Sequence, residues 1–403
     1  MAKHTHFFGQ PIFSQLLSLI DRSKVSGLVN RHQADYYYKA LPTWKHLVSM
    51  LYCSFSGATA LRELSTGLLA VQNKLNHLGI DKAPKRSTLS DGNKKRSSRI
   101  FGDIYMQLVQ KFQFGYSDSR IPKHVFKRLY LIDSTVFSLF KNILSVAGRP
   151  RKDGRSKGGI KAHTMVKASE MMPTLVRFTA GSVHDHTFLK ELMLPTGSYV
   201  VMDKGYTDHS QYLQWSQQGV YYITRMRDNA AYAPLKSLDI THTDQEQTTI
   251  ISDTIINIAV KKQQEVVYLQ QRKIVAWDTD KKRSFVFLTN NIDEDAQTIA
   301  YIYKYRWQIE LLFKKIKQNY PLKYFLGDNQ NAIEIQIWCS LIALLLTEVF
   351  RSRTSRKWAF SNMVALIRFH LMNYVHLIDF LNDPDKALHK LVNDEQQLAM
   401  FPP

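Results

Sequence analysis

The sequence predicts an α/β protein in which a mixed sheet with covering helices follows an all-helical region. Two observations predict this fold class: a change in the period of the apolar residues, and a later stretch that is rich in strands. Apolar residues repeat with the helical period of about 3.6 through roughly residue 120, and from about residue 128 they repeat with the strand period of 2. A third stretch, about 227–292, consists almost wholly of strands and turns and is predicted to be a β-rich insertion.

The charge balance narrows the possible partners. The 403 residues include 54 Lys and Arg against 34 Asp and Glu, which gives a net charge of +20. Such a surplus favours a polyanionic partner, above all nucleic acid. A cation-rich surface without a partner is the alternative. An apolar fraction of 44% excludes a mainly disordered chain.

Other features of the sequence indicate the compartment. Cys53 and Cys339 lie far apart among apolar neighbours, which excludes a disulfide framework or a zinc site and fits a reducing cytoplasm. The longest apolar run, 337–346, is shorter than the roughly 18–20 residues of a membrane helix and predicts a buried core helix. The N-terminus lacks the pattern of a signal peptide. We therefore expect a cytoplasmic, nucleoid-associated protein without a membrane partner.

The helical region is predicted to contain short helices over 44–52 and 61–69, separated at Gly57, and a third helix that starts at Ser90 and runs to Phe112. The start of the third helix is rich in cations. Short helices that lead into a basic one resemble a helix-turn-helix DNA reader. Three cations of that helix are therefore candidate DNA contacts: Lys94, Lys95 and Arg96. A solvated helix face is the alternative.

The remaining elements follow from apolar alternation and from helical periodicity. Strands are expected over 129–137, 160–167, 174–180, 198–203, 221–226, 249–260, 265–277 and 284–289. Helices are expected near 186–193, 211–217, 294–318 and 331–350.

Two aspartates occupy unusual positions. Asp133 lies inside an otherwise apolar strand, and Asp203 closes another. A carboxylate in such a place is costly unless it is paired, hydrogen-bonded or bound to a metal. Either residue alone would fit a turn at the end of a strand, but two of them in strands that can be sheet neighbours favour a metal site.

A third acid, Glu310, stands among cations on a predicted helix. At 100° per residue, Arg306, Glu310, Lys314 and Lys317 all fall within about 60° of Tyr303. An ordinary ion-paired helix face is the alternative, although such a face normally carries both charges in similar numbers. Two aspartates and one glutamate suit a pair of Mg²⁺ ions, with Mn²⁺ as a substitute, and such a pair supports phosphoryl transfer.

The spacing Tyr303-x2-Arg306-x3-Glu310-x6-Lys317 resembles the Y-R-E-K signature of bacterial insertion-sequence transposases of the IS-four type, which are cut-and-paste DDE enzymes. Asp133-Ser134-Thr135 resembles the first aspartate motif of that family. The segment from Asp203 to Tyr206 resembles the second aspartate motif of the family. The similarity covers about residues 125–350.

This resemblance implies a ribonuclease-H-like core that a β-rich insertion interrupts before the glutamate helix. It implies metal-dependent nicking at the ends of a mobile element, hairpin formation and strand transfer into target DNA. Asp133, Asp203 and Glu310 would bind the metal, and Tyr303, Arg306 and Lys317 would grip the transferred end, with Lys314 beside them. We expect a helical DNA-binding domain over 1–120, a catalytic domain over 121–350 and a C-terminal helical region over 351–403. The last region is the expected surface of a homodimer that holds paired terminal inverted repeats.

Three further features are candidates for contact with DNA or metal. Trp277 would correspond to a tryptophan that stacks on a flipped base in the family, although a core position is the alternative. A basic loop could follow a phosphate backbone, and its cations are Arg151, Lys152, Arg155 and Lys157. His184 and His186 flank Asp185 but are better interpreted as hydrogen-bonded surface groups. The phosphate-binding loop of ATP-dependent enzymes is missing from the sequence, so no nucleotide cofactor is expected.

Two other functions remain open at the level of sequence. One is a DNA-binding regulator or domesticated protein that keeps the fold without the chemistry, although all three carboxylates are present. The other is a ribonuclease-H-like nuclease that cuts without strand transfer.

Overall fold

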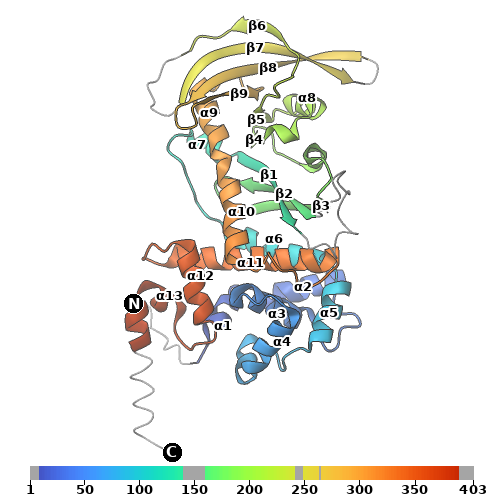
Figure 1. Cartoon of the computed structure of the whole chain (residues 1–403), viewed down its shortest axis with the longest axis vertical. Coiled ribbons are helices and arrows are strands. Elements are labelled where there is room, and N and C mark those ends of the chain that lie inside the picture. Colours follow the sequence, from blue (N-terminus) through green and yellow to red (C-terminus); the bar gives the residue numbers. More distant parts are fainter. Residues whose placement is uncertain (1–8, 139–158, 241–247, 263–264, 390–403) are drawn as a thin grey trace, which may run out of the picture. The chain divides into compact units, whose positions relative to one another are not determined.

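The computed structural model describes residues 9–138, 159–240, 248–262 and 265–389 of the chain (Figure 1). The chain forms two compact units. Unit 1 comprises residues 1–112 and 314–403, and unit 2 comprises residues 113–313. The described part of unit 1 is helical, and unit 2 contains the sheet.

The N-terminal part of unit 1 confirms the predicted helices and adds others. Its elements are α1 (Ile12–Leu17), α2 (Arg22–His32), α3 (Thr43–Ser56), α4 (Leu61–Ala70), η1 (Gln72–Leu78), α5 (Arg86–Lys95) and α6 (Arg99–Lys111). Gly57 ends α3 with φ of 80°, a backbone conformation that glycine adopts without strain.

The expectation of one continuous helix from Ser90 to Phe112 is wrong. The chain becomes extended at Arg96, where φ is −72° and ψ is 126°, and this break separates α5 from α6. The break is stabilised by hydrogen bonds to another helix of unit 1, because the backbone N–H of Ser98 donates to Asn331 Oδ1 at 2.9 Å.

The C-terminal part of unit 1 contains the end of α10 (Trp307–Asn319), α11 (Gln330–Arg353), α12 (Phe360–Phe369) and α13 (Leu377–Asn382). By length and composition α11 could cross a membrane, but 94% of its most apolar window is buried within the structure. This confirms the prediction of a buried core helix around 337–346.

The predicted division into three domains stays a prediction, but the C-terminal helices do not form a compact unit of their own. Residues 351–403 belong to the same compact unit as the N-terminal helices. The backbone N–H of Phe13 donates to Leu371 O at 2.8 Å, and Arg368 Nε donates to Phe55 O at 3.1 Å. Because hydrogen bonds and apolar burial join the two ends of the chain, neither end forms a separate domain in this structure.

Unit 2 is built on one nine-stranded mixed sheet with the order β3-β2-β1-β4-β5-β9-β8-β7-β6 (Figure 1). Its strands are β1 (Leu129–Ser138), β2 (Gly159–Lys167), β3 (Pro173–Ala180), β4 (Tyr199–Val201), β5 (Tyr221–Arg225), β6 (Ala233–Ser237), β7 (Thr248–Lys262), β8 (Glu265–Asp278) and β9 (Arg283–Thr289). The pairs β1–β4 and β4–β5 are parallel, and all other neighbours are antiparallel. All eight predicted strands are present within a few residues.

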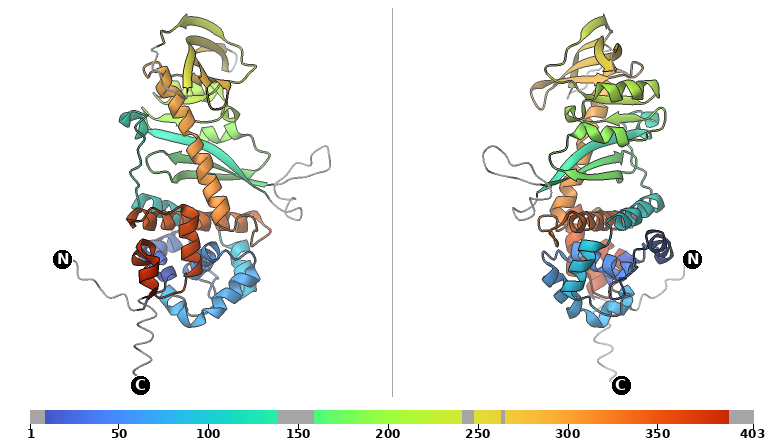
Figure 2. Two further views of the ribbon diagram at one scale, coloured as in Figure 1. Left: turned by 60° about the vertical axis from the view of Figure 1, so that its left-hand side comes forward. Right: turned by 90° about the vertical axis from the view of Figure 1, so that its right-hand side faces the viewer.

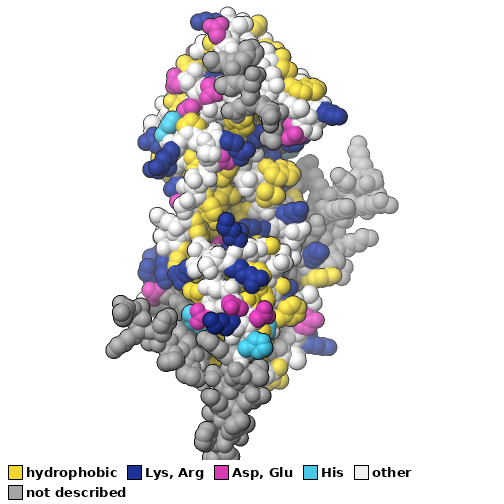
Figure 3. Space-filling model, turned by 90° about the vertical axis from the view of Figure 1, so that its left-hand side faces the viewer, with side chains coloured by type: hydrophobic (Ala, Val, Ile, Leu, Met, Phe, Trp, Pro, Cys, Tyr) yellow, Lys and Arg dark blue, Asp and Glu magenta, His cyan; other side chains and the backbone are white. Residues whose placement is uncertain are grey.

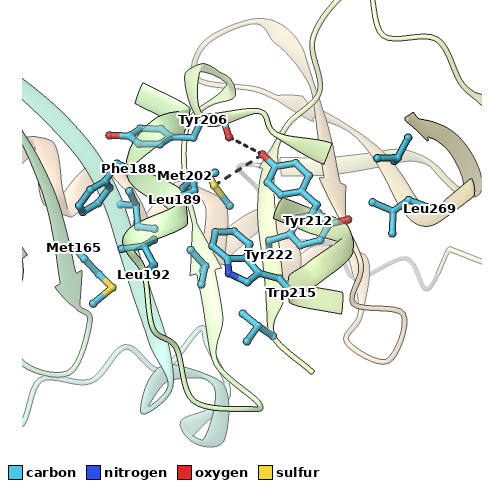
Figure 4. Close-up of a cluster of buried hydrophobic side chains, with 14 residues drawn as sticks. Met165, Phe188, Leu189, Leu192, Met202, Tyr206, Tyr212, Trp215, Tyr222 and Leu269 are labelled. Atoms are coloured by element: carbon cyan, nitrogen blue, oxygen red, sulfur yellow. Dashed lines mark hydrogen bonds between the residues drawn. The ribbon is translucent and has the colours of Figure 1, made fainter. Parts of the chain in front are cut away.

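Helices cover both faces of this sheet (Figure 2). They are α7 (Lys123–Phe126), η3 (Asp185–Glu191), η4 (Lys204–Tyr206), α8 (His209–Gln217) and α9 (Ala296–Tyr305). On one face, α8 packs the rings of Tyr212 and Trp215 into a buried cluster with Val200 and Tyr222 (Figure 4). On the other face, α9 places Tyr303 with its ring centroid 4.9 Å from that of Phe287 on β9.

The predicted β-rich insertion is confirmed as a run of strands, but it is not a separate sheet. Its last strand, β9, pairs antiparallel with β5, so the insertion extends the central sheet. The long strands β7 and β8 pair along almost their whole length. The insertion therefore leads the chain back to the sheet immediately before the helix that carries Glu310.

The predicted helix over 294–318 is interrupted at Arg306, which separates α9 from α10. There the backbone N–H of Ile309 donates to Arg306 O at 3.1 Å, an i to i+3 bond that is typical of the tighter 3-10 turn. The break lies between Tyr303 and Glu310, two of the predicted site residues, and it sets how they face the sheet.

Candidate active site

The two aspartates meet at the centre of the sheet because their strands are parallel neighbours. Leu131 on β1 pairs with Val201 on β4, and the same register continued by two residues sets Asp203 beside Asp133. Both carboxylates are partly buried, with side chains 16% and 35% exposed. The sheet thus brings together two acids that are 70 positions apart in the sequence.

The α9–α10 segment adds three side chains to the aspartates. Arg306 Nη1 donates to Asp133 Oδ2 at 2.8 Å, and Arg306 Nη2 donates to Glu310 Oε1 at 2.6 Å. Tyr303 donates its hydroxyl to Asp203 Oδ1 at 3.2 Å. These hydrogen bonds join the five residues in two groups, Asp133–Arg306–Glu310 and Tyr303–Asp203, and the guanidinium carbon of Arg306 lies 5.8 Å from the ring centroid of Tyr303.

Burial raises the pKa of Asp133 to about 6, and the neighbouring Glu310 and Asp203 carboxylates add to this effect. Arg306 and the Ser134 backbone N–H oppose it. The pKa of Arg306 is raised above its ordinary value: burial alone would lower it, and Asp133, Tyr303 and Glu310 outweigh burial. The carboxylates thus repel one another, and the guanidinium group is the cation that holds them together.

Sequence reasoning missed one residue of this site. Arg225, the last residue of β5, donates from Nη2 to Asp203 Oδ1 at 3.0 Å. Burial alone would raise the pKa of Asp203, but Arg225, the Lys204 backbone N–H and Arg306 hold it below its ordinary value. The available signal was positional, because Arg225 ends the strand that follows Asp203 in the chain.

A hydrogen-bonded network connects Ser134, the residue after the first aspartate, to Asp185. Ser134 Oγ donates to Asp185 Oδ1 at 2.9 Å, and Lys161 Nζ donates to the same oxygen at 3.2 Å. Asp185 therefore bonds to the strands that flank the site, while the rings of His184 and His186 lie against each other with centroids 5.7 Å apart. Neither histidine forms part of a metal-ligating cluster among the described residues.

The donors of this site have the chemistry that a divalent cation requires. They are carboxylate oxygens, which Mg²⁺ and Mn²⁺ prefer, and the pKa of Asp133 is raised mainly by burial, with smaller contributions from the other two acids. Within the described residues, however, no three Asp, Glu, His or Cys side chains lie close enough to hold one ion. Arg306 lies between two of the three carboxylates, so an ion that used both would have to displace its guanidinium group.

The other predicted DNA contacts are distributed over both units. Lys314 is exposed and Lys317 is half-buried on α10, and burial lowers the pKa of Lys317. Trp277, near the end of β8, has a side chain that is 39% exposed, so it is not a core residue. Lys94 and Lys95 are exposed at the end of α5. Lys and Arg side chains are scattered over both units on the face shown in Figure 3.

One predicted contact is wrong, and four lie outside the described residues. Arg96 is 2% exposed and donates to the carbonyl groups of Ala34 and Leu41, so it supports the fold of unit 1 and cannot reach DNA. The four cations of the basic loop are not in the described ranges: Arg151, Lys152, Arg155 and Lys157.

Comparison with known proteins agrees with this geometry. Residues 124–346 match the family described as the transposase DDE domain, and residues 8–81 match a domain of unknown function. Because the first match covers more than half of the chain, the protein belongs to the DDE transposase family. It is a DNA transposase, an enzyme that cuts DNA, and enzymes of this family use divalent metal ions.

The relatives of the chain are named as transposases. A Sinorhizobium fredii protein with the name transposase y4zB is 28% identical over 66% of this chain and 72% of its own length. The transposase of insertion sequence element IS4SA from Synechocystis is 24% identical over 77% and 83% of the two chains. The transposase of element IS5377 from Geobacillus stearothermophilus is 25% identical over 57% of this chain and 59% of its own length. A solved piggyBac transposase synaptic complex with hairpin DNA aligns with 93% of this chain and 80% of its own at 11% identity, with a TM-score of 0.43 that is too low to support an inference.

Proposed function

We propose that this transposase nicks the terminal inverted repeats of its own mobile element, forms a hairpin at each end and joins the freed end to target DNA. The observation that carries the proposal is the bridge that Arg306 makes between Asp133 and Glu310. It places the third acid next to the aspartates although 107 positions separate Glu310 from Asp203. An ordinary solvated helix face would not direct Glu310 and Arg306 toward a partly buried aspartate of the sheet.

In this proposal Asp133, Asp203 and Glu310 hold Mg²⁺, which would activate the attacking oxygen and stabilise the leaving oxygen when it is bound. The chain itself supplies the cations that neutralise the scissile phosphate. Arg306, which contacts two of the acids, would donate to phosphate oxygens when substrate is bound, and Arg225 would hold Asp203 in place.

Residues of the α9–α10 segment would have two roles, contact with the carboxylates and contact with the DNA strand. Tyr303 donates its hydroxyl to Asp203 Oδ1, and its pKa is raised to about 12 by burial, with Arg306 opposing and Asp203 adding to the shift. It is therefore a neutral hydrogen-bond donor at physiological pH. Lys314 and Lys317, further along α10, would contact the strand beyond the scissile phosphate, and Trp277 would stack on an extrahelical base during hairpin formation.

Strand transfer requires two element ends, so we propose that a homodimer acts on paired ends in the bacterial cytoplasm. The C-terminal helices of unit 1 are the proposed contact. Sedimentation of the protein with end-containing DNA should show two copies of the chain and two DNA ends in one complex. A complex with one protein and one end at working concentrations would contradict the dimer.

Glu310→Gln is the decisive variant, because it keeps the shape and hydrogen bonding of the side chain but removes its charge. It should abolish nicking, hairpin formation and strand transfer while DNA binding remains. The products are resolved on a gel in Mg²⁺, in Mn²⁺ and in a chelator, beside a binding titration in the chelator. Wild-type cleavage by this variant would disprove the assignment, and nicking by the native protein without joined products would favour a nuclease.

A further inference from the structure

A turn in unit 1 presents two neighbouring aromatic side chains to solvent. It connects α2 to α3, and in it Tyr36 is 65% exposed and Tyr37 is 86% exposed. Their ring centroids lie 4.1 Å apart at an interplanar angle of 61°. The two rings therefore pack on each other rather than into the core, and the fold gains little from burying them.

The backbone under this pair is strained. Tyr37 has φ of 66°, in the left-handed region where a bulky side chain is unfavourable and where glycine is the usual residue. Strain of this kind persists only where the surrounding structure enforces it, and it concentrates at functional positions. The side chain of Tyr37 is exposed, so its burial does not compensate for the strain. This indicates that the exposed ring has a function.

A buried arginine enforces the turn. Arg96 donates from Nε to Ala34 O at 3.2 Å and from Nη2 to Leu41 O at 2.5 Å, which are carbonyl groups on the two sides of the tyrosine pair. Its guanidinium carbon also lies 4.2 Å from the ring centroid of Tyr38. The turn is further fixed by Asp35, which accepts from the backbone N–H of Thr43 at 2.6 Å.

The same arginine joins the turn to a segment that carries exposed cations. Lys94 and Lys95 directly precede Arg96 in the chain and are exposed at the end of α5. Lys39 is exposed at the far side of the turn, and the one acid inside the turn, Asp35, lies 3.4 Å from Arg96 Nη2. Lys39 is therefore an exposed cation of the turn itself, and Arg96 links the turn to the segment that holds Lys94 and Lys95.

We propose that the Tyr36–Tyr37 turn, which lies in the domain of unknown function at the N-terminus, binds double-stranded DNA together with Lys94 and Lys95, which follow that domain in the chain. The lysines neutralise phosphates, and the tyrosine hydroxyls donate to phosphate and sugar oxygens. Two rings inclined at 61° to each other cannot both stack on successive parallel bases, which favours duplex over single-stranded DNA. This inference rests on DNA being the partner, as proposed for the whole chain, and assigns it a contact remote in sequence from the carboxylates.

Tyr37→Gly and Tyr37→Phe test the site in the full-length protein. The probe is a fluorescently labelled DNA duplex of random sequence, titrated in chelator at several salt concentrations, beside a thermal melt. The glycine variant should melt at or above the wild-type temperature, because it relieves the positive φ, and yet bind about tenfold more weakly. The phenylalanine variant keeps the ring and should lose a similar factor with the hydroxyl.

The lysines and a matched aromatic control complete the design. Lys94→Ala and Lys95→Ala should each reduce the slope of log affinity against log salt by about 0.9, whereas the tyrosine variants should leave that slope unchanged. Phe369→Ala removes an equally exposed ring of unit 1, 81% exposed, and should not change binding. Tyr36→Phe provides a second hydroxyl deletion that does not depend on the strained position.

The outcomes are distinct. Weaker binding by folded Tyr37→Gly and Tyr36→Phe, with unchanged binding by Phe369→Ala, supports the site. Wild-type affinity in both tyrosine variants, or tighter binding of single-stranded than duplex probe through these rings, would overturn it. If the native protein binds no duplex, the proposed function of the whole chain is contradicted, and not only the tyrosine site. The titration of the native protein shows this before any variant is compared.

Discussion

Arg306 and Asp133 are 173 positions apart in the chain, and their side chains are joined by a hydrogen bond of 2.8 Å. The same guanidinium group holds Glu310 at 2.6 Å, so one cation connects the central sheet to the helix that completes the site. Because its side chain is only 12% exposed, this cation is screened weakly by solvent. The pairing explains how a site rich in negative charge is held together by the chain alone.

Removing this cation should be costly in the absence of metal. Arg306→Gln leaves the Asp133 and Glu310 carboxylates without their shared partner, and breaking such a buried pair costs about 3 kcal/mol. Chemical denaturation in chelator should show this loss, and added Mg²⁺ should recover more of it in the variant than in the native protein. Arg120→Gln is the matched control, because Arg120 pairs with Asp118 at the surface with 59% of its side chain exposed. Equal losses in the two variants would contradict the assigned role of Arg306.

The raised pKa of Asp133 predicts a pH dependence of stability. The folded state takes up a proton near pH 6, whereas the unfolded chain does so near 3.8. Between these values the native state binds more protons, so this group makes the metal-free protein more stable as the pH falls from about 7 to 4. Asp133→Asn should remove that gain and melt at a higher temperature than the native protein at pH 7.5 in chelator.

The comparison of the two proteins at pH 7.5 and pH 5 isolates this aspartate from other titrating groups. The difference in melting temperature should shrink at the lower pH, because the native carboxyl is then largely neutral. A difference that is constant over this range would mean that Asp133 titrates normally.

Arg225 should act on catalysis through Asp203. Arg225→Gln removes the charged partner that holds the pKa of Asp203 low, so the apparent pKa for cleavage should rise. The rate should fall by about tenfold or more near neutral pH and recover partly at higher pH. The measurement is a pH profile of single-turnover nicking. Arg225→Lys keeps the positive charge, so it should restore the apparent pKa of the profile more fully than the maximal nicking rate. A uniform loss at every pH would indicate a structural role instead.

Arg96 should matter for folding and not directly for DNA contact. Arg96→Met keeps the length of the side chain but leaves the carbonyl groups of Ala34 and Leu41 unpaired, which should cost about 3 kcal/mol or more. Lys94→Met, two positions earlier and exposed, should leave stability unchanged and weaken DNA binding. Denaturation curves and binding titrations on both variants separate the two roles. Full stability of Arg96→Met would contradict the assigned support of the turn.

The sequence by itself determined the order of elements and the identity of the acids. The change of apolar period from 3.6 to 2 placed the sheet after the helical region, because buried faces impose these periods locally. Asp133 and Asp203 stood out because a carboxylate in an apolar strand needs a partner, and a fixed spacing around Glu310 drew attention to the helix. Each of these signals is carried by residues that are close together in the chain.

Only the tertiary structure decided which residues meet. The parallel pairing of β1, β4 and β5 brings Asp133, Asp203 and Arg225 together, and the position of Arg225 at the end of a strand does not by itself identify Asp203 as its partner. Arg96 was expected to contact DNA because it lies in a cation-rich segment. It is buried instead, because its guanidinium group donates hydrogen bonds to carbonyl groups more than 50 positions away in the chain. The C-terminal helices join the N-terminal ones for the same reason. Partners distant in sequence compete for each side chain, and the free energy of burial and pairing over the whole fold decides the outcome.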